Sequence, residues 1–248
     1  METFLFDRFA ENEDRHWWFR GRREVLMSVL DRHLARAPES GPRHLLDVGC
    51  GTGFMLEAMR RFGEVEGLET SPEARDYCRR RVPDVTLYDI PLPEGLPHGR
   101  RYDAITAFDV IEHIEDPRPS LEAISRALAP GGTFICTVPA FSFLWSRHDD
   151  VNHHFRRYTR GSLVEELRRA GLRVEFTSYF NAWLFAPVAA VRLAQKLIPE
   201  RGSGSDMDTP PPMPINETLT RLFASEKHVV PTLGLPFGVS LLAVAKRA

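Results

Sequence analysis

Three glycines at alternating positions, Gly49, Gly51 and Gly53, lie between an apolar strand-like run and a helix-like run. A glycine turn between a strand and a helix lets a ligand approach the backbone closely, because no side chain blocks it. It also presents backbone N–H groups at the start of the helix to a polar or anionic group. This segment predicts a cofactor site. Many nucleotide-binding folds place glycine here, so the residues downstream must decide between them.

Acidic residues follow the next two strand-like runs. Glu69 lies about 20 residues after the glycines, where a carboxylate can accept hydrogen bonds from both ribose hydroxyls of an adenosine. Asp89 can accept from the adenine amino group, while the neighbouring Ile90 covers the ring. Taken alone, Glu69 has the plainer interpretation of a solvated surface charge.

A buried strand-like run over 102–109 ends in polar residues, among them Asp109 and His113. Ligands bind at the carboxyl ends of the strands in open α/β sheets, so these side chains should face the same site. An isolated Asp109, like Asp47 before the glycines, has the plainer interpretation of a cap on a helix or a turn. The functional interpretation gains weight because all these residues fall at strand ends on one edge.

The segment 140–160 is rich in histidine, arginine and aromatic residues and follows another strand-like run, so it should emerge on the same edge. It has three interpretations: contact with a substrate, a structural loop of satisfied polar groups, or a metal site. Its spacing matches no standard zinc pattern, and we expect no metal. We favour substrate contact, with the catalytic candidates His148, His154 and Tyr158 and the substrate-binding candidates Asn152 and Arg157.

Strand-like and helix-like runs alternate through the chain, which predicts an α/β fold with a mostly parallel sheet and helices on both faces. The strand-like runs are 44–48, 64–69, 85–88, 102–109, 132–138, 173–180 and 238–246. The helix-like runs between them are 53–62, 72–81, 118–129 and 161–170. Pro130-Gly131-Gly132 should separate the helix 118–129 from the next strand.

The length of 248 residues suits one domain with insertions. Apolar residues at helical spacing predict a helix within the N-terminal part. The apolar run 180–198 is interrupted by polar and charged residues. We expect it to cover the active site or form a dimer surface rather than span a membrane, and a membrane-surface helix is the alternative. We divide 1–248 into an N-terminal helical extension (1–43), a cofactor-binding core (44–180), lid insertions (140–160 and 181–237, with a linker-like 202–214) and a final strand (238–248).

The composition excludes several classes of protein. A net charge of −2 gives no bulk attraction to nucleic acid, and we expect no nucleic-acid partner. The three cysteines, Cys50, Cys78 and Cys136, are widely spaced and suggest a reducing compartment. The N-terminus lacks the basic region and apolar run of a secretory signal, so we expect a cytoplasmic location.

Five motifs in a fixed order resemble those of class I S-adenosylmethionine-dependent methyltransferases. They are LDVGCGTG (46–53), GLETSPEA (67–74), the Asp89 segment, FDVIEHIEDP (108–117) and LAPGGTFICTVP (128–139). Together they span 44–140. The resemblance implies a Rossmann-like seven-stranded sheet of order 3-2-1-4-5-7-6 and S-adenosyl-L-methionine as the cofactor. We expect the last strand, 238–246, to lie antiparallel at the edge of the sheet.

The resemblance also implies roles for individual residues. Gly49 and Gly51 would pass close to the methionine part of the cofactor, and Asp47 would orient their loop. Glu69 would bind the ribose, where the family more often has Asp. The remaining implied cofactor contacts are Cys50 and Thr70 beside these residues, Asp89 and Ile90 at the adenine, Phe108 and Asp109 beneath the sulfonium, and His113.

The flanking segments resemble a narrower branch, marked by His16-Trp17-Trp18-Phe19-Arg20-Gly21-Arg22-Arg23 and by His148-Asp149 followed by the 154–159 segment HFRRYT. Arg22 matches an arginine that contacts the cofactor carboxylate in related enzymes. Trp18 would close over the cofactor together with Trp17, or the pair would pack the extension on the core.

We expect methyl transfer to a small-molecule acceptor, favouring O-methylation of a sugar, a glycolipid precursor or a secondary metabolite. A hydroxyl acceptor must lose its proton, and histidine titrates in the useful range. His148 is the first candidate for this base, His154 the second and His113 the third. N- or C-methylation of a natural product and a non-catalytic cofactor-binding protein are alternatives. A nicotinamide enzyme is disfavoured because Phe54 stands where G-x-G-x-x-G continues.

Overall fold

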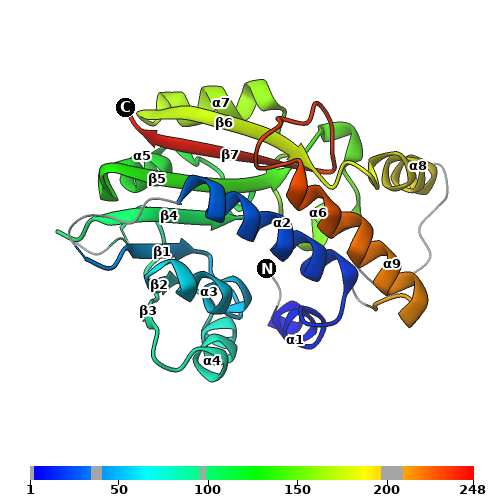
Figure 1. Ribbon diagram of the computed structural model, residues 1–248, viewed down its shortest axis with the longest axis horizontal. Helices are drawn as coiled ribbons and strands as arrows, with labels where there is room; N and C mark the ends of the chain where they lie inside the picture. Colours follow the sequence, from blue (N-terminus) through cyan, green and yellow to red (C-terminus); the bar gives the residue numbers. More distant parts are fainter. Residues whose placement is uncertain (1–2, 35–40, 95, 97–98, 197–208) are drawn as a thin grey trace.

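The computed structural model describes residues 3–34, 41–94, 96, 99–196 and 209–248, and it shows a sheet flanked by helices (Figure 1). Seven strands of this described part form one sheet in the order β3-β2-β1-β4-β5-β7-β6, which confirms the predicted order. β7 runs antiparallel to both of its neighbours, and the other neighbours are parallel. The expectation that the last strand lies at the edge was wrong, because β7 pairs with β5 on one side and β6 on the other, which leaves β6 at the edge. The strands are β1 (His44–Val48), β2 (Glu64–Leu68), β3 (Thr86–Tyr88), β4 (Tyr102–Phe108), β5 (Leu128–Pro139), β6 (Leu172–Phe180) and β7 (Ser240–Arg247).

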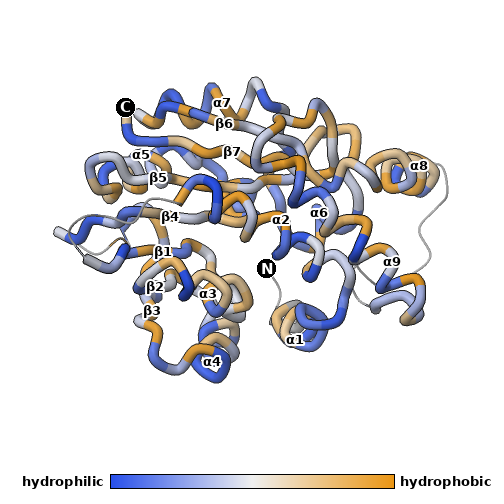
Figure 2. The backbone as a smooth tube through the Cα atoms, in the orientation of Figure 1, coloured by the Kyte–Doolittle hydropathy of each residue, from blue (hydrophilic) through white to orange (hydrophobic). Residues whose placement is uncertain are grey.

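Helices cover both faces of the sheet, as the alternation of runs predicted (Figure 1). One core lies under α5 (Arg118–Ala127) and α7 (Arg160–Arg169) and includes Leu121 and Leu163. The second core lies on the opposite face and includes Leu26 and Phe223. Its helices are α2 (Trp17–His33), α3 (Phe54–Met59), α4 (Pro72–Arg81) and α9 (Met213–Ala224). Apolar positions concentrate on the central strands, and polar positions on helices such as α4 (Figure 2).

The N-terminal extension forms α1 (Thr3–Asn12) and the longer α2. α2 packs against α9, a helix that the sequence patterns did not indicate (Figure 1). Gly21 permits this approach, since a Cβ there would lie 2.8 Å from Cβ of Phe223. The amide side chain of Asn216 on α9 also accepts from Trp17 N at 2.9 Å and donates to Arg15 O at 2.7 Å. α9 thereby fixes the start of α2.

The predicted boundary between the helix 118–129 and the strand after it differs from the structure. α5 ends at Ala127 and β5 already begins at Leu128, so the segment 130–132 lies inside the strand rather than before it. Leu128 pairs with Tyr102, and the register then shifts before Thr133 pairs with Ala104. The predicted turn is therefore accommodated as an irregularity of the β4–β5 pairing.

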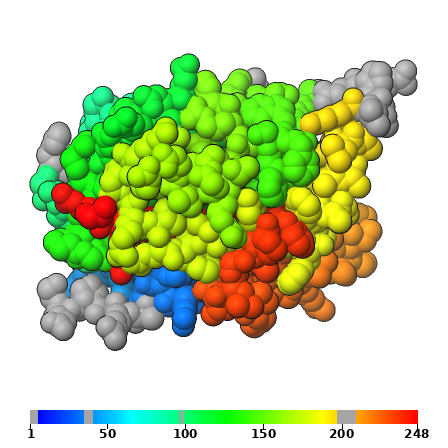
Figure 3. Space-filling view, turned by 90° about the horizontal axis from the view of Figure 1, so that it is seen from above, coloured from blue at the N-terminus to red at the C-terminus, as the bar shows by residue number. Residues whose placement is uncertain are grey.

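The second insertion contains α8 (Phe185–Gln195), which is shorter than the predicted run 180–198. α8 lies at one end of the molecule, beside α9 (Figure 3). None of the helices in the described ranges is long and apolar enough to cross a membrane. Residues 202–208 of the predicted linker lie outside the described residues, and the rest of it leads into α9.

Candidate active site

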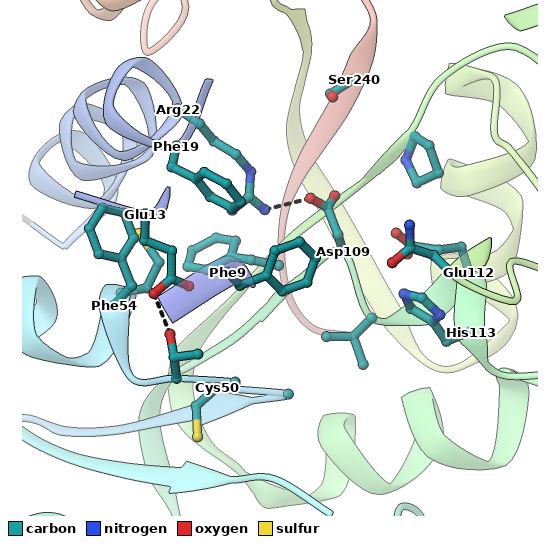
Figure 4. A pocket seen from close by; sticks show the side chains of 18 of the residues that line it. Phe9, Glu13, Phe19, Arg22, Cys50, Phe54, Asp109, Glu112, His113 and Ser240 are labelled. Atoms are coloured by element: carbon teal, nitrogen blue, oxygen red, sulfur yellow. Dashed lines mark hydrogen bonds and ion pairs between the residues drawn. The ribbon is translucent and has the colours of Figure 1, made fainter. Parts of the chain in front are cut away.

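A cavity of about 500 Å³ opens at the carboxyl ends of β1, β2, β4 and β5 (Figure 4). Its walls come from the loops after these strands, from the N-terminal extension and from the first insertion. The extension contributes mostly aromatic side chains, namely Phe6, Phe9, Trp18 and Phe19. This is the edge where ligands bind in open α/β sheets, and a partly open, partly apolar cavity with a few polar groups suits a small molecule.

The glycine loop is fixed against the neighbouring strands. Gly49 has a φ of +67°, and a Cβ there would lie 2.5 Å from Cγ2 of Val110, so both the conformation and the space require glycine. Asp47 accepts a hydrogen bond of 2.6 Å from Thr106 Oγ1, which ties β1 to β4 just before the loop. Burial raises the pKa of Asp47 to about 7, although the bond from Thr106 opposes this.

Cys50 lines the cavity, but its thiol lies beneath the loop. A Cβ on Gly67 of β2 would approach the Cys50 sulfur to 2.7 Å. A hydrogen bond with Cys78, together with burial, raises the pKa of the Cys50 thiol. A thiol in this state is a poor nucleophile.

The carboxylate of Glu69 supports the glycine loop directly. One oxygen accepts from Gly51 N at 3.0 Å and the other from Ser71 N at 2.9 Å. Arg75 donates at 2.8 Å to the carbonyl oxygens of both Glu69 and Thr70. Glu69 is 8% exposed and lines the cavity, so it is not a solvated surface charge.

Asp89 and Ile90 do not line the cavity. The side chain of Asp89 is 66% exposed and lies 3.9 Å from Nη2 of Arg75, and Ile90 is 53% exposed. Their predicted contacts with adenine stay predictions.

Arg22 reaches from α2 to the sheet (Figure 4). Its Nη2 donates to Asp109 Oδ2 at 2.7 Å and to Thr137 Oγ1 at 3.0 Å. The guanidinium also lies over the ring of Trp18, 5.0 Å from its centroid, and 5.8 Å from that of Phe108. The structure therefore brings together four predicted residues: Trp18, Arg22, Phe108 and Asp109. Arg22 connects the N-terminal extension to the floor of the cavity.

The first insertion contains a buried ionic cluster centred on Asp149, in α6 (Arg147–Val151). Asp149 accepts from Nδ1 of His154 and from Nε of Arg157, both at 2.8 Å. Arg157 also donates to Ala140 O at 2.9 Å. Burial opposes ionisation of Asp149, but the hydrogen bonds from His154 and Arg157 outweigh it and hold the pKa of its carboxyl below the ordinary value.

The other predicted histidines also line the cavity. The amide of Asn152 lies 3.3 Å from Nδ1 of His148, and burial lowers the pKa of His148 to about 4. Burial and the neighbouring His154 lower the pKa of His113 to about 4, the two rings lying 4.6 Å apart between centroids.

Tyr158 lies in the core beside Leu163 and does not line the cavity. Its hydroxyl is buried without a hydrogen-bond partner among the described residues, and burial raises its pKa. The structure does not bring this catalytic candidate to the site, because the 154–159 segment directs its side chain into the core under α7.

Glu112 is fully buried at the cavity, and neither of its carboxylate oxygens has a hydrogen-bond partner in the described ranges (Figure 4). Burial raises the pKa of Glu112 well above its ordinary value. One ligand atom each from Glu112, His113 and His154 lie within 4.8 Å of one another, so this cluster has the donor atoms for a divalent cation. The prediction that the protein holds no metal is open to test at this cluster.

Comparison with known proteins identifies the family. The family model described as a methyltransferase domain matches residues 18–176. This chain belongs to the methyltransferase family. Ubiquinone biosynthesis O-methyltransferase of Xanthomonas campestris pv. campestris (strain B100) is 29% identical over 195 residues, 69% of this chain and 81% of the relative. The enzyme of the same name from Proteus mirabilis (strain HI4320) is 28% identical over 156 residues, 58% of this chain and 64% of the relative.

Solved structures share the fold of this methyltransferase. The complex between the Haloferax volcanii Trm112 methyltransferase activator and the putative methyltransferase gives a TM-score of 0.58 at 24% identity, over 98% of this chain and 97% of that one. Geranyl diphosphate C-methyltransferase from Streptomyces coelicolor A3(2), solved with S-adenosyl-L-homocysteine, gives 0.57 at 18% identity, over 91% and 79%. The protein is thus an S-adenosylmethionine-dependent methyltransferase, as its motifs predicted.

Several cavity residues of this methyltransferase were not predicted from sequence. They are Glu13, Thr52, Glu112 and Arg192. Asp149, which contacts His154 but does not itself line the cavity, was not predicted either. Three had a signal, since Thr52 lies in the motif LDVGCGTG, Glu112 lies in the motif FDVIEHIEDP and Asp149 adjoins His148. Glu13 and Arg192 had none, because the docking of α1 and α8 depends on long-range packing.

Proposed function

We propose that this methyltransferase transfers the methyl group of S-adenosylmethionine to a hydroxyl of a small molecule, and that His154 removes the hydroxyl proton. The observation that carries the proposal is the hydrogen bond of 2.8 Å between His154 Nδ1 and buried Asp149 at the wall of the cavity. The names of the O-methyltransferase relatives support the choice of oxygen as acceptor.

The Asp149–His154 pair meets the requirements of a general base. An ionised carboxylate only accepts hydrogen bonds, so the Nδ1 of His154 carries the proton and Nε2 is left to accept one. Asp149 fixes this tautomer and the ring orientation, as a carboxylate does in a Ser-His-Asp triad. His148 was the first candidate from sequence, but its pKa of about 4 makes it a weak base at neutral pH.

The cofactor supplies the activated methyl group, and the protein must align the acceptor with it and exclude water. We propose that Glu69 binds the ribose, that the Gly49–Gly51 loop binds the methionine part, and that Phe108 and Asp109 lie beneath the sulfonium. Aromatic walls from α1 and α2 support enclosure of the cofactor.

The acceptor that we propose is a sugar, a glycolipid precursor or a secondary metabolite. Arg157 is committed to Asp149 and Ala140, so its role is to hold the base rather than to bind an anionic acceptor. Arg192 of α8 also lines the cavity, and its Nη1 donates to Leu144 O at 2.9 Å, so it too is held by the protein.

The alternative reactions, the location and the partners of the protein are proposals as well. N- or C-methylation and non-catalytic cofactor binding are the alternatives to O-methylation. We retain a cytoplasmic location, no nucleic-acid partner, and α8 as the surface for a homodimer or for contact with a membrane. A cation held by Glu112, His113 and His154 is the alternative to a histidine base, because it would also acidify a bound hydroxyl.

The test is methyl transfer by His154→Ala, measured as S-adenosylhomocysteine formation with a panel of catechols, alkyl glycosides and polyketide alcohols. His153→Asn is the matched control, because His153 is exposed and its φ of +55° is tolerated by asparagine. We expect kcat to fall by about 10²- to 10⁴-fold in His154→Ala, with unchanged cofactor binding. Full activity of His154→Ala would exclude this residue as the base.

A further inference from the structure

The N-terminal extension brings one acidic and one basic side chain into the cavity, Glu13 and Arg22. Glu13 lies in the turn between α1 and α2, and Arg22 lies one and a half turns into α2. The charge of Arg22 is close enough to lower the pKa of Glu13. The extension therefore presents an anion and a cation together at the wall that faces the glycine loop (Figure 4).

Glu13 contacts the glycine loop through a single oxygen. Its Oε2 accepts a hydrogen bond from the hydroxyl of Thr52, the residue that follows Gly51, and lies 3.5 Å from Nη2 of Arg81. Oε1 makes no hydrogen bond to another residue in the part of the chain that the structure describes. Glu13 is 7% exposed and lines the cavity, and Oε1 is not among the side-chain atoms shut off from solvent, so a ligand in the cavity can reach this oxygen.

Burial of Glu13 disfavours the ionised form of its carboxyl group. Burial raises its pKa to about 7, although the hydrogen bond from Thr52 and the charge of Arg81 both oppose the rise. A buried carboxylate of this kind gains most from a cationic partner that arrives with a ligand.

We propose that Glu13 binds the ammonium group of the cofactor's methionine part, so that Glu13 and Arg22 together recognise the amino-acid end of S-adenosylmethionine. The proposal rests on the proposed position of that methionine part at the Gly49–Gly51 loop. A primary ammonium carries three donors and no acceptor, and a carboxylate within reach is its strongest partner.

The other carboxyl groups of the cavity are less suited to this ammonium. Glu69 accepts two backbone N–H groups and Asp109 accepts from Arg22 and Thr137. Asp47 lies under the loop against Thr106. Glu112 is on the opposite side of Asp109 from Glu13, beside the histidines (Figure 4). Among these carboxyl groups, only Glu13 lies both on the N-terminal extension and beside the glycine loop.

With Glu13 in this position, the N-terminal extension would favour a cofactor that carries the amino-acid part over an adenosine that lacks it. α1 is held to α4 by Asp7, which accepts from the hydroxyl of Tyr77 at 2.7 Å, and Asp14 lies 3.2 Å from Arg81. These contacts lie outside the cavity and place Glu13 independently of any ligand. The ammonium then adds a bond that an adenosine lacking the amino-acid part cannot make.

The experiment is calorimetric titration of the full chain with S-adenosylhomocysteine and with 5′-methylthioadenosine, which lacks the amino-acid part. We expect Glu13→Gln to weaken binding of S-adenosylhomocysteine about tenfold or more, since hydrogen bonds to charged groups are among the stronger ones. Its affinity for methylthioadenosine should change less than about twofold. Thr52→Val is the matched control, because it removes the contact with the loop and keeps the carboxylate, and it should retain most of the affinity.

Equal losses for both ligands in Glu13→Gln would overturn the proposal in favour of a purely structural contact with Thr52. Equal affinity of the unmodified protein for the two ligands would overturn the position of the methionine part as well. If the glutamine variant proves unstable, Glu13→Asp takes its place: its carboxylate is shorter, so it should lose affinity for S-adenosylhomocysteine and keep its affinity for methylthioadenosine, and equal losses for both ligands would again overturn the proposal. These titrations use no acceptor, so an error in the assignment of His154 leaves them unchanged.

Discussion

The buried carboxyl group of Asp47 should make the stability of the unliganded protein fall as the pH rises through the neutral range. Its pKa rises from 3.8 to about 7 on folding, so the folded state holds this proton more tightly than the unfolded state does. The stabilisation is complete below about pH 4 and is lost as the pH approaches 7. A tenfold change in proton affinity is worth about 1.4 kcal/mol, so the loss amounts to about 4 kcal/mol in total and about 3 kcal/mol between pH 5 and pH 8.

The substitution Asp47→Asn isolates this contribution. Asparagine keeps an oxygen that accepts the hydrogen bond from Thr106 and carries no charge at any pH. Urea unfolding of both proteins at pH 5, 6, 7 and 8, without cofactor, gives the free energy of unfolding. The difference in favour of Asp47→Asn should grow by about 3 kcal/mol from pH 5 to pH 8. A difference that stays constant over this range would refute the assignment of a raised pKa to Asp47.

Two further predictions concern the glycine loop and the cluster at Glu112. Gly49→Ala should abolish measurable binding of S-adenosylhomocysteine in calorimetry, because its Cβ would collide with Val110. Gly131→Ala is the control, because Gly131 also has a positive φ, meets no neighbour within 4 Å and does not line the cavity, so this variant should retain binding. Similar affinities of the two variants would contradict this reasoning. Prolonged treatment with EDTA should leave methyl transfer unchanged if His154 is the base. Loss of activity that Mg²⁺ or Mn²⁺ restores in the unmodified protein, but not in Glu112→Gln, would instead assign the proton removal to a bound cation.

The sheet could be predicted from sequence because its signals are local and strong. Apolar runs such as 102–109 alternate with helix-like runs, and the order of the motifs implied the strand order that the structure confirms. α9 escaped prediction because its partner, α2, lies about 200 residues earlier in the chain. The Pro-Gly-Gly segment 130–132 was placed before the strand, since local turn signals do not show that Leu128 already pairs with Tyr102.

The cofactor side of the cavity was predicted more fully than the acceptor side. Arg22, Glu69 and Asp109 were assigned through motifs, and all three line the cavity. On the acceptor side, the sequence ranked His148 first, His154 second and His113 third as the base, without a contact that could decide between them. His154 is distinguished from His148 by Asp149, a contact that depends on how α6 folds back on the 154–159 segment.

The most direct test of the proposed mechanism is chemical rescue of His154→Ala by imidazole, with an acceptor that the unmodified enzyme methylates. Imidazole that enters the space left by the side chain can accept the hydroxyl proton in place of His154. We expect the lost rate to return in part, in proportion to the concentration of neutral imidazole, with no effect on His153→Asn. A His154→Ala enzyme that is fully active without imidazole would contradict the assignment of His154 as the base.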